Sequence, residues 1–147
     1  TFELDLGYGF GENAYADTTT LMNAAITLKW RPTDHSTAQS FSLTSEFNRR
    51  QISGATADSM VGALSNWVQY QLAQRWWVQA RYEMLNFPAP DAGKTTKTSA
   101  LLGYVPTEYS ALRLQYDLVN EAAEALNEHR VTLQLNVSLG THPAHTY

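Results

Sequence analysis

Apolar and polar residues alternate along most of this chain with a period of two. In Thr1–Gly11 every second residue from Phe2 to Phe10 is apolar, and Glu3 and Asp5 lie between them. His129–Gly140 repeats the pattern with Val and Leu set against Arg, Thr, Gln, Asn and Ser. Successive side chains of a strand point to opposite faces, so this alternation predicts β-strands with one apolar and one polar face.

Six further segments with the same character lie between these two, although the phase of one of them, residues 98–105, is ambiguous. The chain is therefore predicted to contain eight strands: Thr1–Gly11, Thr19–Trp30, Gln39–Arg49, Met60–Leu72, Trp76–Leu85, Thr98–Val105, Ser110–Leu118 and His129–Gly140.

The expected connections tend to alternate in length. Ala73–Arg75 and Pro106–Tyr109 are short, and Arg31–Ala38 on the same rim is intermediate. The other rim carries the mostly longer connections, of which Val119–Glu128 has a locally helical composition: Gly11–Thr18, Arg50–Ser59, Asn86–Lys97 and Val119–Glu128. An even number of strands with short turns on one rim and long loops on the other is typical of transmembrane β-barrels.

The fold class predicted from these patterns is all-β, an antiparallel up-and-down transmembrane β-barrel. Its four hairpins occupy residues 1–139, and residues 140–147 form a short periplasmic tail. The eight strands are either a complete small barrel or the last eight strands of a larger one.

Composition helps to orient the two faces. Charged residues make up only 16% of the chain and aromatic residues 12%, whereas a water-facing sheet carries roughly a quarter to a third of charged residues. Five aromatic residues adjoin the shorter turns, where amphipathic rings form an interfacial girdle in membrane barrels: Trp30, Tyr70, Trp76, Tyr104 and Tyr109. These features favour an apolar face toward lipid. The alternative is a soluble ligand-binding β-barrel, in which the same face points inward.

Other classes of protein are excluded or disfavoured by simple counts. The sequence has no apolar run of about 20 residues, which a membrane-spanning helix needs, and it is too rich in aromatic residues for a disordered chain. The net charge of −4 disfavours nucleic-acid binding. With no cysteine, the chain has neither disulfides nor a cysteine zinc site.

Several stretches resemble a family of bacterial outer-membrane proteins. They are ITLKWRP (26–32), SFSLTSEFNRRQ (40–51), YQLAQRWWVQARYE (70–83), YSALRLQYD (109–117) and LQLNVSLGTHPAHTY (133–147). They are similar to the C-terminal β-barrel of the family labelled zinc-regulated or TonB-dependent outer-membrane receptors. The resemblance implies a porin-like barrel in the bacterial outer membrane, with TonB as a partner only if a plug lies outside this chain. It also makes Tyr147 an assembly signal for the barrel-assembly machinery.

Charged residues fall on the polar face of the predicted strands, with both signs in similar numbers. They are expected to form a paired ladder in a filled barrel, to line a water-filled lumen, or to build a specific ligand site. Arg113 and Arg130 are expected to face inward on adjacent strands near Asp117, which makes this the first pairing to examine. The full set is Glu3, Asp5, Lys29, Glu46, Arg81, Glu83, Arg113, Asp117 and Arg130.

Histidines offer the remaining candidate chemistry. His142 and His145 form an H-x-x-H that is either a zinc ligand pair, with His35 as a third ligand, or a solvated tail. His129 beside Glu128 has no partnered serine nucleophile, so we expect no enzyme activity and no cofactor other than zinc. Arg49 and Arg50 form a dibasic pair at the long-loop rim, either a solvated strand end or a contact to lipopolysaccharide phosphate.

The function predicted from the sequence is an outer-membrane pore, or the barrel part of a receptor or transporter, for small solutes. Its expected partners are outer-membrane lipid, the barrel-assembly machinery and a small solute, without nucleic acid. Two alternatives remain at this point: a closed structural or adhesive barrel with a filled interior, and the soluble ligand-binding barrel.

Overall fold

The protein consists of eight long β-strands. The structure is a computed structural model that describes residues 1–33, 38–54, 58–87, 93–121 and 126–138. The strands are β1 (Phe2–Glu12), β2 (Thr18–Trp30), β3 (Ser40–Ser53), β4 (Ser59–Ala73), β5 (Trp76–Leu85), β6 (Thr95–Thr107), β7 (Ser110–Glu121) and β8 (Leu126–Val137).

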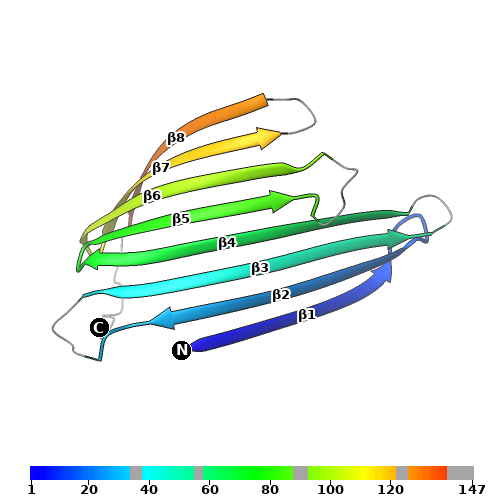
Figure 1. Cartoon of the computed structure of the whole chain (residues 1–147), viewed down its shortest axis with the longest axis horizontal. Helices are drawn as coiled ribbons and strands as arrows, with labels where there is room; N and C mark the ends of the chain where they lie inside the picture. The colour runs from blue at the N-terminus through cyan, green and yellow to red at the C-terminus, as the bar shows by residue number, and fades with distance from the viewer. Residues whose placement is uncertain (34–37, 55–57, 88–92, 122–125, 139–147) are drawn as a thin grey trace.

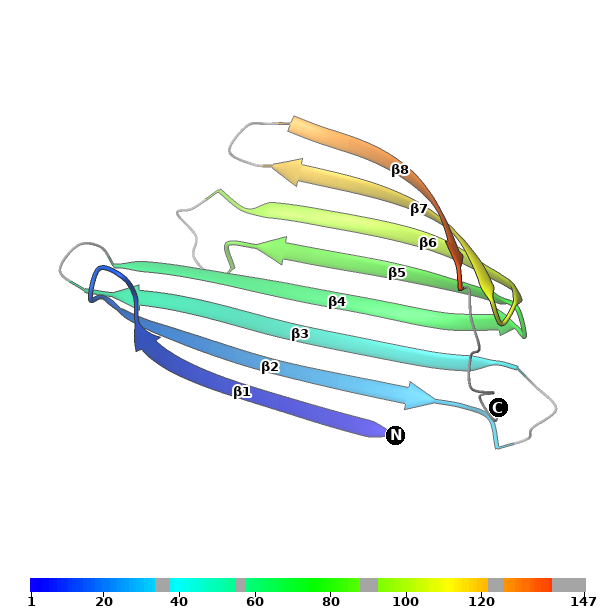
Figure 2. The same ribbon diagram turned by 180° about the vertical axis from the view of Figure 1, so that it is seen from behind.

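All eight strands belong to one sheet, and each pairs antiparallel with its neighbours in the sequence (Figure 1). The up-and-down order is therefore confirmed. The sheet is not closed, however, because β1 and β8 are its two edges and are not hydrogen-bonded to each other. The expectation of a closed eight-stranded barrel is thus corrected to a single curved and twisted layer, which Figure 2 shows from behind.

The strands extend further than the apolar pattern indicated. β6 begins at Thr95, and β7 continues to Glu121, which pairs with Leu126 at the start of β8. Backbone hydrogen bonds continue through polar pairs at the strand ends, because the ladder does not depend on which side chain it carries. The prediction of a connection spanning Val119–Glu128 is therefore wrong, and the described residues at both of its ends are strand rather than helix.

The pairing register keeps like residues on the same face. Phe2 lies opposite Leu28, and this row continues through Leu43, Val68, Ala80, Ala100, Tyr116 and Val131. The row also settles the phase of β6, in which Ala100 and Leu102 share the apolar face while Ser99 and Leu101 lie on the other. A slip of one residue in any pair would have sent apolar side chains to the polar face.

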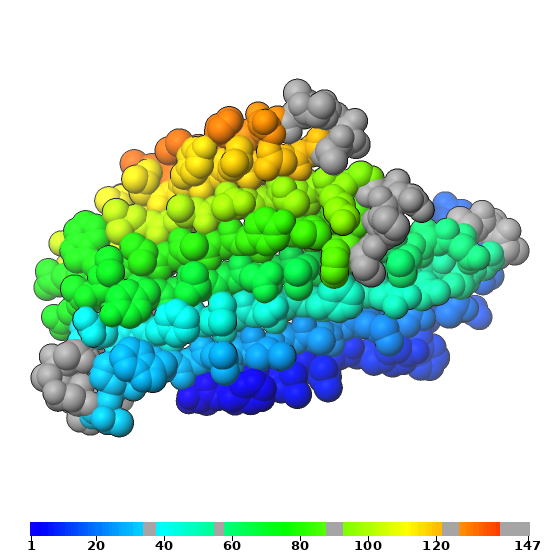
Figure 3. Space-filling model, in the orientation of Figure 1, coloured from blue at the N-terminus to red at the C-terminus, as the bar shows by residue number. Residues whose placement is uncertain are grey.

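The apolar face is the exposed one. Leu114 and Tyr116 on the inner strand β7 are 47% and 43% exposed, whereas the buried residues Thr44, Ser99, Leu101 and Asp117 all project from the polar face. Figure 3 shows one broad surface of the sheet, on which no second layer of described residues covers the strands. In a sheet that folds around its own apolar core the distribution would be the reverse.

The described residues contain no helix of the length and apolar character needed to cross a bilayer.

A close approach on the polar face depends on a glycine. Trp77 lies opposite Gly103 on β6, and Gly103 lies opposite Arg113 on β7. A Cβ atom at Gly103 would stand 2.1 Å from Cε2 of the Trp77 ring, so the ring packs directly on the glycine backbone. The Arg113 guanidinium carbon lies 5.2 Å from the centroid of the same ring, a cation–π contact.

Replacement of Gly103 by alanine is expected to destabilise the sheet, because the new methyl group would displace Trp77 from the backbone and from Arg113. We expect Gly103→Ala to lower the free energy of unfolding by about 1–3 kcal/mol, measured by urea titration of the refolded chain. Gly9→Ala is the matched control, since a Cβ at Gly9 meets no atom within 4 Å. Equal effects of the two substitutions would contradict this account of Gly103.

Candidate functional site

The polar face of the sheet gathers the charged residues that the sequence analysis singled out. The strand register places all of them on this face: Glu3, Asp5, Lys29, Glu46, Arg81, Glu83, Arg113, Asp117 and Arg130. The register adds Lys97, between Glu83 and Val119 in the ladder. The sequence analysis missed Lys97 because the predicted strand began at Thr98 and its phase was ambiguous.

Four of these side chains form a chain of alternating charge across β5, β6 and β7. Arg81 Nη2 lies 2.7 Å from Glu83 Oε1. Lys97 Nζ then lies 3.8 Å from Glu83 Oε2 and 3.5 Å from Asp117 Oδ1. Lys97 therefore bridges two carboxylates, which would repel each other without it.

Asp117 is the most enclosed member of this chain, with only 3% of its surface exposed. Its carboxylate accepts hydrogen bonds from Ser99 Oγ and from Gln115 Nε2, the latter at 2.8 and 3.0 Å. A carboxylate buried to this degree requires such partners, because an unpaired charge in that position is costly.

Arg113 and Arg130 lie on the polar face of adjacent strands, as expected, but the cation that forms an ion pair with Asp117 is Lys97. Arg130 lies opposite Asp117 in the ladder, but its Nη2 donates to Glu128 Oε1 at 2.6 Å. Arg113 covers the ring of Trp77 instead. Lys97 lies on β6, which pairs with β7 on the side away from β8, and from there its ammonium group reaches the Asp117 carboxylate.

A second network lies across β2 and β3. Glu46 Oε1 accepts from Asn23 Nδ2 at 3.2 Å and from Asn48 Nδ2 at 2.8 Å. One row away, the hydroxyl groups of Thr27 and Thr44 are 3.0 Å apart. Beside these amide and hydroxyl groups the same half carries an ion pair, in which Lys29 Nζ lies 2.9 Å from Glu3 Oε2, so both halves of the face are charged.

Beside the second network the polar face is hollowed. A depression of 610 Å³ extends over β1–β4, and most of its lining residues project from the polar face. Gly7 and Gly9 of β1 contribute no side chain to it, which leaves room above the strand. The polar face therefore combines a crowded half on β5–β7 with a more open half on β1–β4.

These groups can bind water, ions and polar solutes, but they do not assemble a recognisable catalytic centre within the described residues. His129 Nδ1 lies 2.6 Å from the Tyr116 hydroxyl on the opposite face of the sheet. No cluster of three or more His, Asp or Glu side chains suited to a metal occurs in the described ranges. His35, His142, His145 and Tyr147 lie outside those ranges, so their assigned roles stay predictions.

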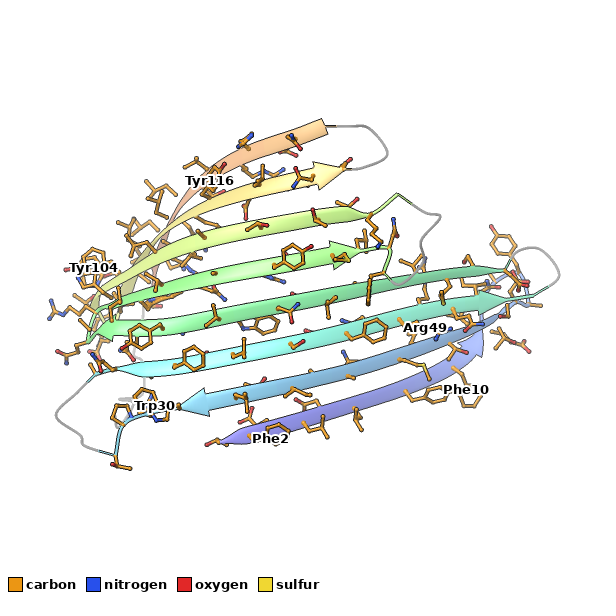
Figure 4. All side chains as sticks on the ribbon, in the orientation of Figure 1. Phe2, Phe10, Trp30, Arg49, Tyr104 and Tyr116 are labelled. Carbon is orange, nitrogen blue, oxygen red and sulfur yellow. The ribbon has the colours of Figure 1, made fainter. Side chains whose placement is uncertain are left out.

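The aromatic residues of the expected girdle gather at one end of the sheet. Trp30 and Tyr70 flank Phe41 in one row of the apolar face, and the rings of Trp76 and Tyr104 stack with centroids 4.4 Å apart. Figure 4 shows Trp30 and Tyr104 at this end and Phe10 toward the other.

Tyr109, the fifth predicted girdle residue, lies in the turn between β6 and β7 at the same end of the sheet and is 43% exposed. The neighbouring Glu108 carboxylate raises the pKa of its phenol through a hydrogen bond and through its charge. The phenol therefore stays protonated, and able to donate, to higher pH than an isolated tyrosine.

The apolar band runs obliquely across the strands. At one end of the strands the band begins at Phe2 on β1. The row of Phe2 reaches Ala80 on β5, four strand pairs away, but on β5 the band extends four residues further, to Trp76. The boundary at the other end of the strands shifts in the same direction. On β1 it lies at Phe10, eight residues from the row of Phe2, whereas on β8 it lies at Val131, which belongs to that row. Both boundaries therefore shift by about one residue per strand.

Comparison of the chain with protein-family models, with curated proteins and with solved structures finds no match in any of the three. The resemblance to the receptor family stated from the sequence therefore stays a hypothesis.

Removal of the Lys97 charge is expected to destabilise the fold, because Glu83 and Asp117 would then face each other without a cation. We expect Lys97→Met to cost about 1–2 kcal/mol of unfolding free energy, less than for a fully buried pair since Lys97 is 32% exposed. Lys29→Met is the control, because its bridge to Glu3 is about half exposed and should be worth less than about 1 kcal/mol. Equal losses in urea titrations of the two variants would contradict this role of Lys97.

Proposed function

We propose that this chain forms the wall of an outer-membrane β-barrel through which small polar solutes pass. The apolar face contacts the acyl chains of the membrane, and the polar face lines the lumen. Solutes move by diffusion or gated uptake along the charged and amide side chains, and the longer connections select among them.

The observation that carries the proposal is the distribution of exposure over the two faces. On the inner strand β7, Leu114 and Tyr116 are 47% and 43% exposed on the apolar face, while Asp117 on the opposite face is only 3% exposed. The buried Ser99 and Thr44 lie on the same face as Asp117. Water would disfavour such a surface, because contiguous exposed apolar patches of this extent mark a contact with lipid or with protein. In a transmembrane barrel the same distribution is the stable one.

The oblique course of the apolar band supports a membrane contact. A shift of one residue, roughly 3.3 Å, for each strand spacing of roughly 4.8 Å corresponds to a slope of about 35°. Strands of transmembrane barrels tilt by about 35–45° against the membrane normal. A band that is level in the membrane would therefore cross this sheet at about the observed angle.

The length of the band supports the same contact. From Phe2 to Phe10 on β1, and from Met22 to Trp30 on β2, the apolar face spans nine residues. A tilted strand needs about 9–11 residues to cross the hydrocarbon region.

A pore requires a closed wall, so the proposal includes the pairing of the free edges of β1 and β8, either with each other or with further strands of a larger barrel. Active TonB-coupled uptake is not part of it, because such uptake needs a plug domain and none of the eight described strands forms one. The filled structural barrel and the soluble barrel are the outcomes that the experiments below separate from a pore.

Two tryptophans lie on each face, and this gives a direct test of orientation. Trp30 and Trp76 lie on the apolar face, whereas Trp67 and Trp77 lie on the polar face. In variants that retain a single tryptophan, refolded into vesicles of brominated phospholipid, we expect strong fluorescence quenching of Trp30 and Trp76 and little quenching of Trp67 and Trp77.

The opposite ranking, or the absence of quenching at all four positions, would contradict the proposed membrane orientation. A chain that stays folded without detergent and shows no quenching is the result expected of the soluble barrel. Phenylalanine at the three replaced positions keeps an aromatic ring at each site and so limits changes in packing.

Conductance in a planar bilayer tests the pore itself. Discrete ion steps are expected for a water-filled lumen, whereas a quiet bilayer is expected for a barrel filled by its side chains. Lys97→Gln removes a positive charge from the polar face, so the reversal potential in a salt gradient should shift toward cation selectivity. Lys94→Gln, just outside β6, is the control with a smaller expected shift; wild-type chain that inserts without conducting would overturn the pore.

A further inference from the structure

Arg49 differs from the other basic residues of the strands by the face on which it lies. The register places it opposite Met22 on β2 and Gly62 on β4, in an apolar-face row that begins at Tyr8. Among the lysines and arginines of the eight described strands it alone has this position. Its neighbour Arg50 lies opposite Leu21 and Val61 on the polar face, so the dibasic pair seen in the sequence divides between two environments.

Arg49 stands at the boundary of the apolar band that is farther from the Trp30–Tyr104 end (Figure 4). It follows Phe47, the last apolar residue of β3 on this face, and is itself followed by the polar side chain of Gln51. A cation on the lipid-facing surface of a barrel costs about 2–4 kcal/mol at the middle of the bilayer but about 0–1 near the interface. The position of Arg49 is therefore the level at which lipid phosphate groups lie.

The hydrogen-bonding capacity of Arg49 is only partly used. Its Nη2 donates to Gln51 Oε1 at 2.9 Å, while its Nε is buried and has no hydrogen-bond partner in the structure. A guanidinium presents five N–H donors in a planar fork that fits two oxygens of a phosphate at once. The N–H groups of Arg49 that are not donated to Gln51 leave capacity for such an acceptor.

An apolar shelf lies next to this guanidinium. The Phe87 backbone nitrogen donates to Gly62 O at 3.0 Å, and a Cβ at Gly62 would stand 1.7 Å from Phe87 O. The chain after β5 thus folds closely over Gly62, beside Arg49 in the same row. The rings of Phe47 and Phe87 meet edge to face with centroids 6.5 Å apart.

We propose that Arg49 and the Phe47–Phe87 shelf bind one phosphate-bearing lipid on the outer surface of the sheet. The guanidinium N–H groups that are not donated to Gln51 donate to the phosphate oxygens, and an acyl chain of the same lipid packs on the two phenylalanine rings. Free inorganic phosphate offers the same oxygens without the acyl chain. This inference rests on the proposed membrane contact of the apolar face.

The test compares lipid retention by four forms of the full chain refolded in dodecylmaltoside micelles: wild type, Arg49→Gln, Arg49→Lys and Arg50→Gln. Each is incubated with lipid A, with phosphatidylglycerol, with the zwitterionic phosphatidylcholine or with inorganic phosphate, and the bound molecules are counted by native mass spectrometry. We expect wild type and Arg50→Gln to retain lipid A or phosphatidylglycerol. Arg49→Gln should bind about tenfold more weakly, the loss typical of a charge-assisted hydrogen bond, and Arg49→Lys should be intermediate because it retains the charge without the fork.

Equal lipid retention by Arg49→Gln and wild type would overturn the site, as would an equal loss in Arg50→Gln. Binding of inorganic phosphate as tight as that of the lipids would overturn the lipid assignment. The quenching experiment with single tryptophans distinguishes a failure of the membrane proposal from a failure of the lipid site. A chain that fails it defeats the membrane proposal together with this site, whereas a chain that passes it and shows no effect of Arg49→Gln defeats this site alone.

Discussion

The structure depends above all on the register in which consecutive strands pair. Each of the seven pairs brings apolar residues opposite apolar residues, so that the row from Phe2 reaches Val131 with an uncharged side chain at every step. Because side chains alternate with a period of two, a shift of one residue in any pair would exchange the two faces beyond it. The separation of an exposed apolar face from an enclosed polar face is a direct consequence.

Because the faces are separated, the polar face holds many charged side chains that need partners. Charged side chains that would be independent on a water-facing sheet are crowded together, and Asp117 is almost fully enclosed. These side chains are stabilised by neighbours of opposite charge, by amide donors such as Gln115, and by the contacts of two arginines with tryptophan rings. Gly103 contributes by leaving space for Trp77. On β1 and its neighbours the same face is open, because Gly7 and Gly9 carry no side chains.

The oblique course of the apolar band connects local pattern to global geometry. Its two boundaries shift alike from strand to strand, as they would if both were level with the surfaces of a membrane. Arg49 marks one boundary on β3, and the Trp76–Tyr104 stack marks the other on β5 and β6. The apolar band and the polar face therefore present two different surfaces, one of exposed apolar side chains and one of charged and amide groups.

Much of this organisation was predictable from the sequence, because alternation with a period of two follows directly from strand geometry. Residue order alone predicted the eight strands, their antiparallel order, the face on which each predicted charge lies, and the aromatic end of the sheet. Strand ends were less predictable, since polar pairs such as Asn120 with Asn127 extend a ladder without leaving an apolar signal.

The partners of individual side chains could be decided only by the tertiary structure. Lys97, rather than Arg113 or Arg130, reaches Asp117, because the choice depends on the relative stagger of β6, β7 and β8. The open edges at β1 and β8 and the shelf that Phe87 forms beside Arg49 depend on long-range geometry in the same way. The sequence by itself determined which residues share a face, because that follows from position along one strand; which of them touch depends on distances between strands, and only the folded sheet sets those.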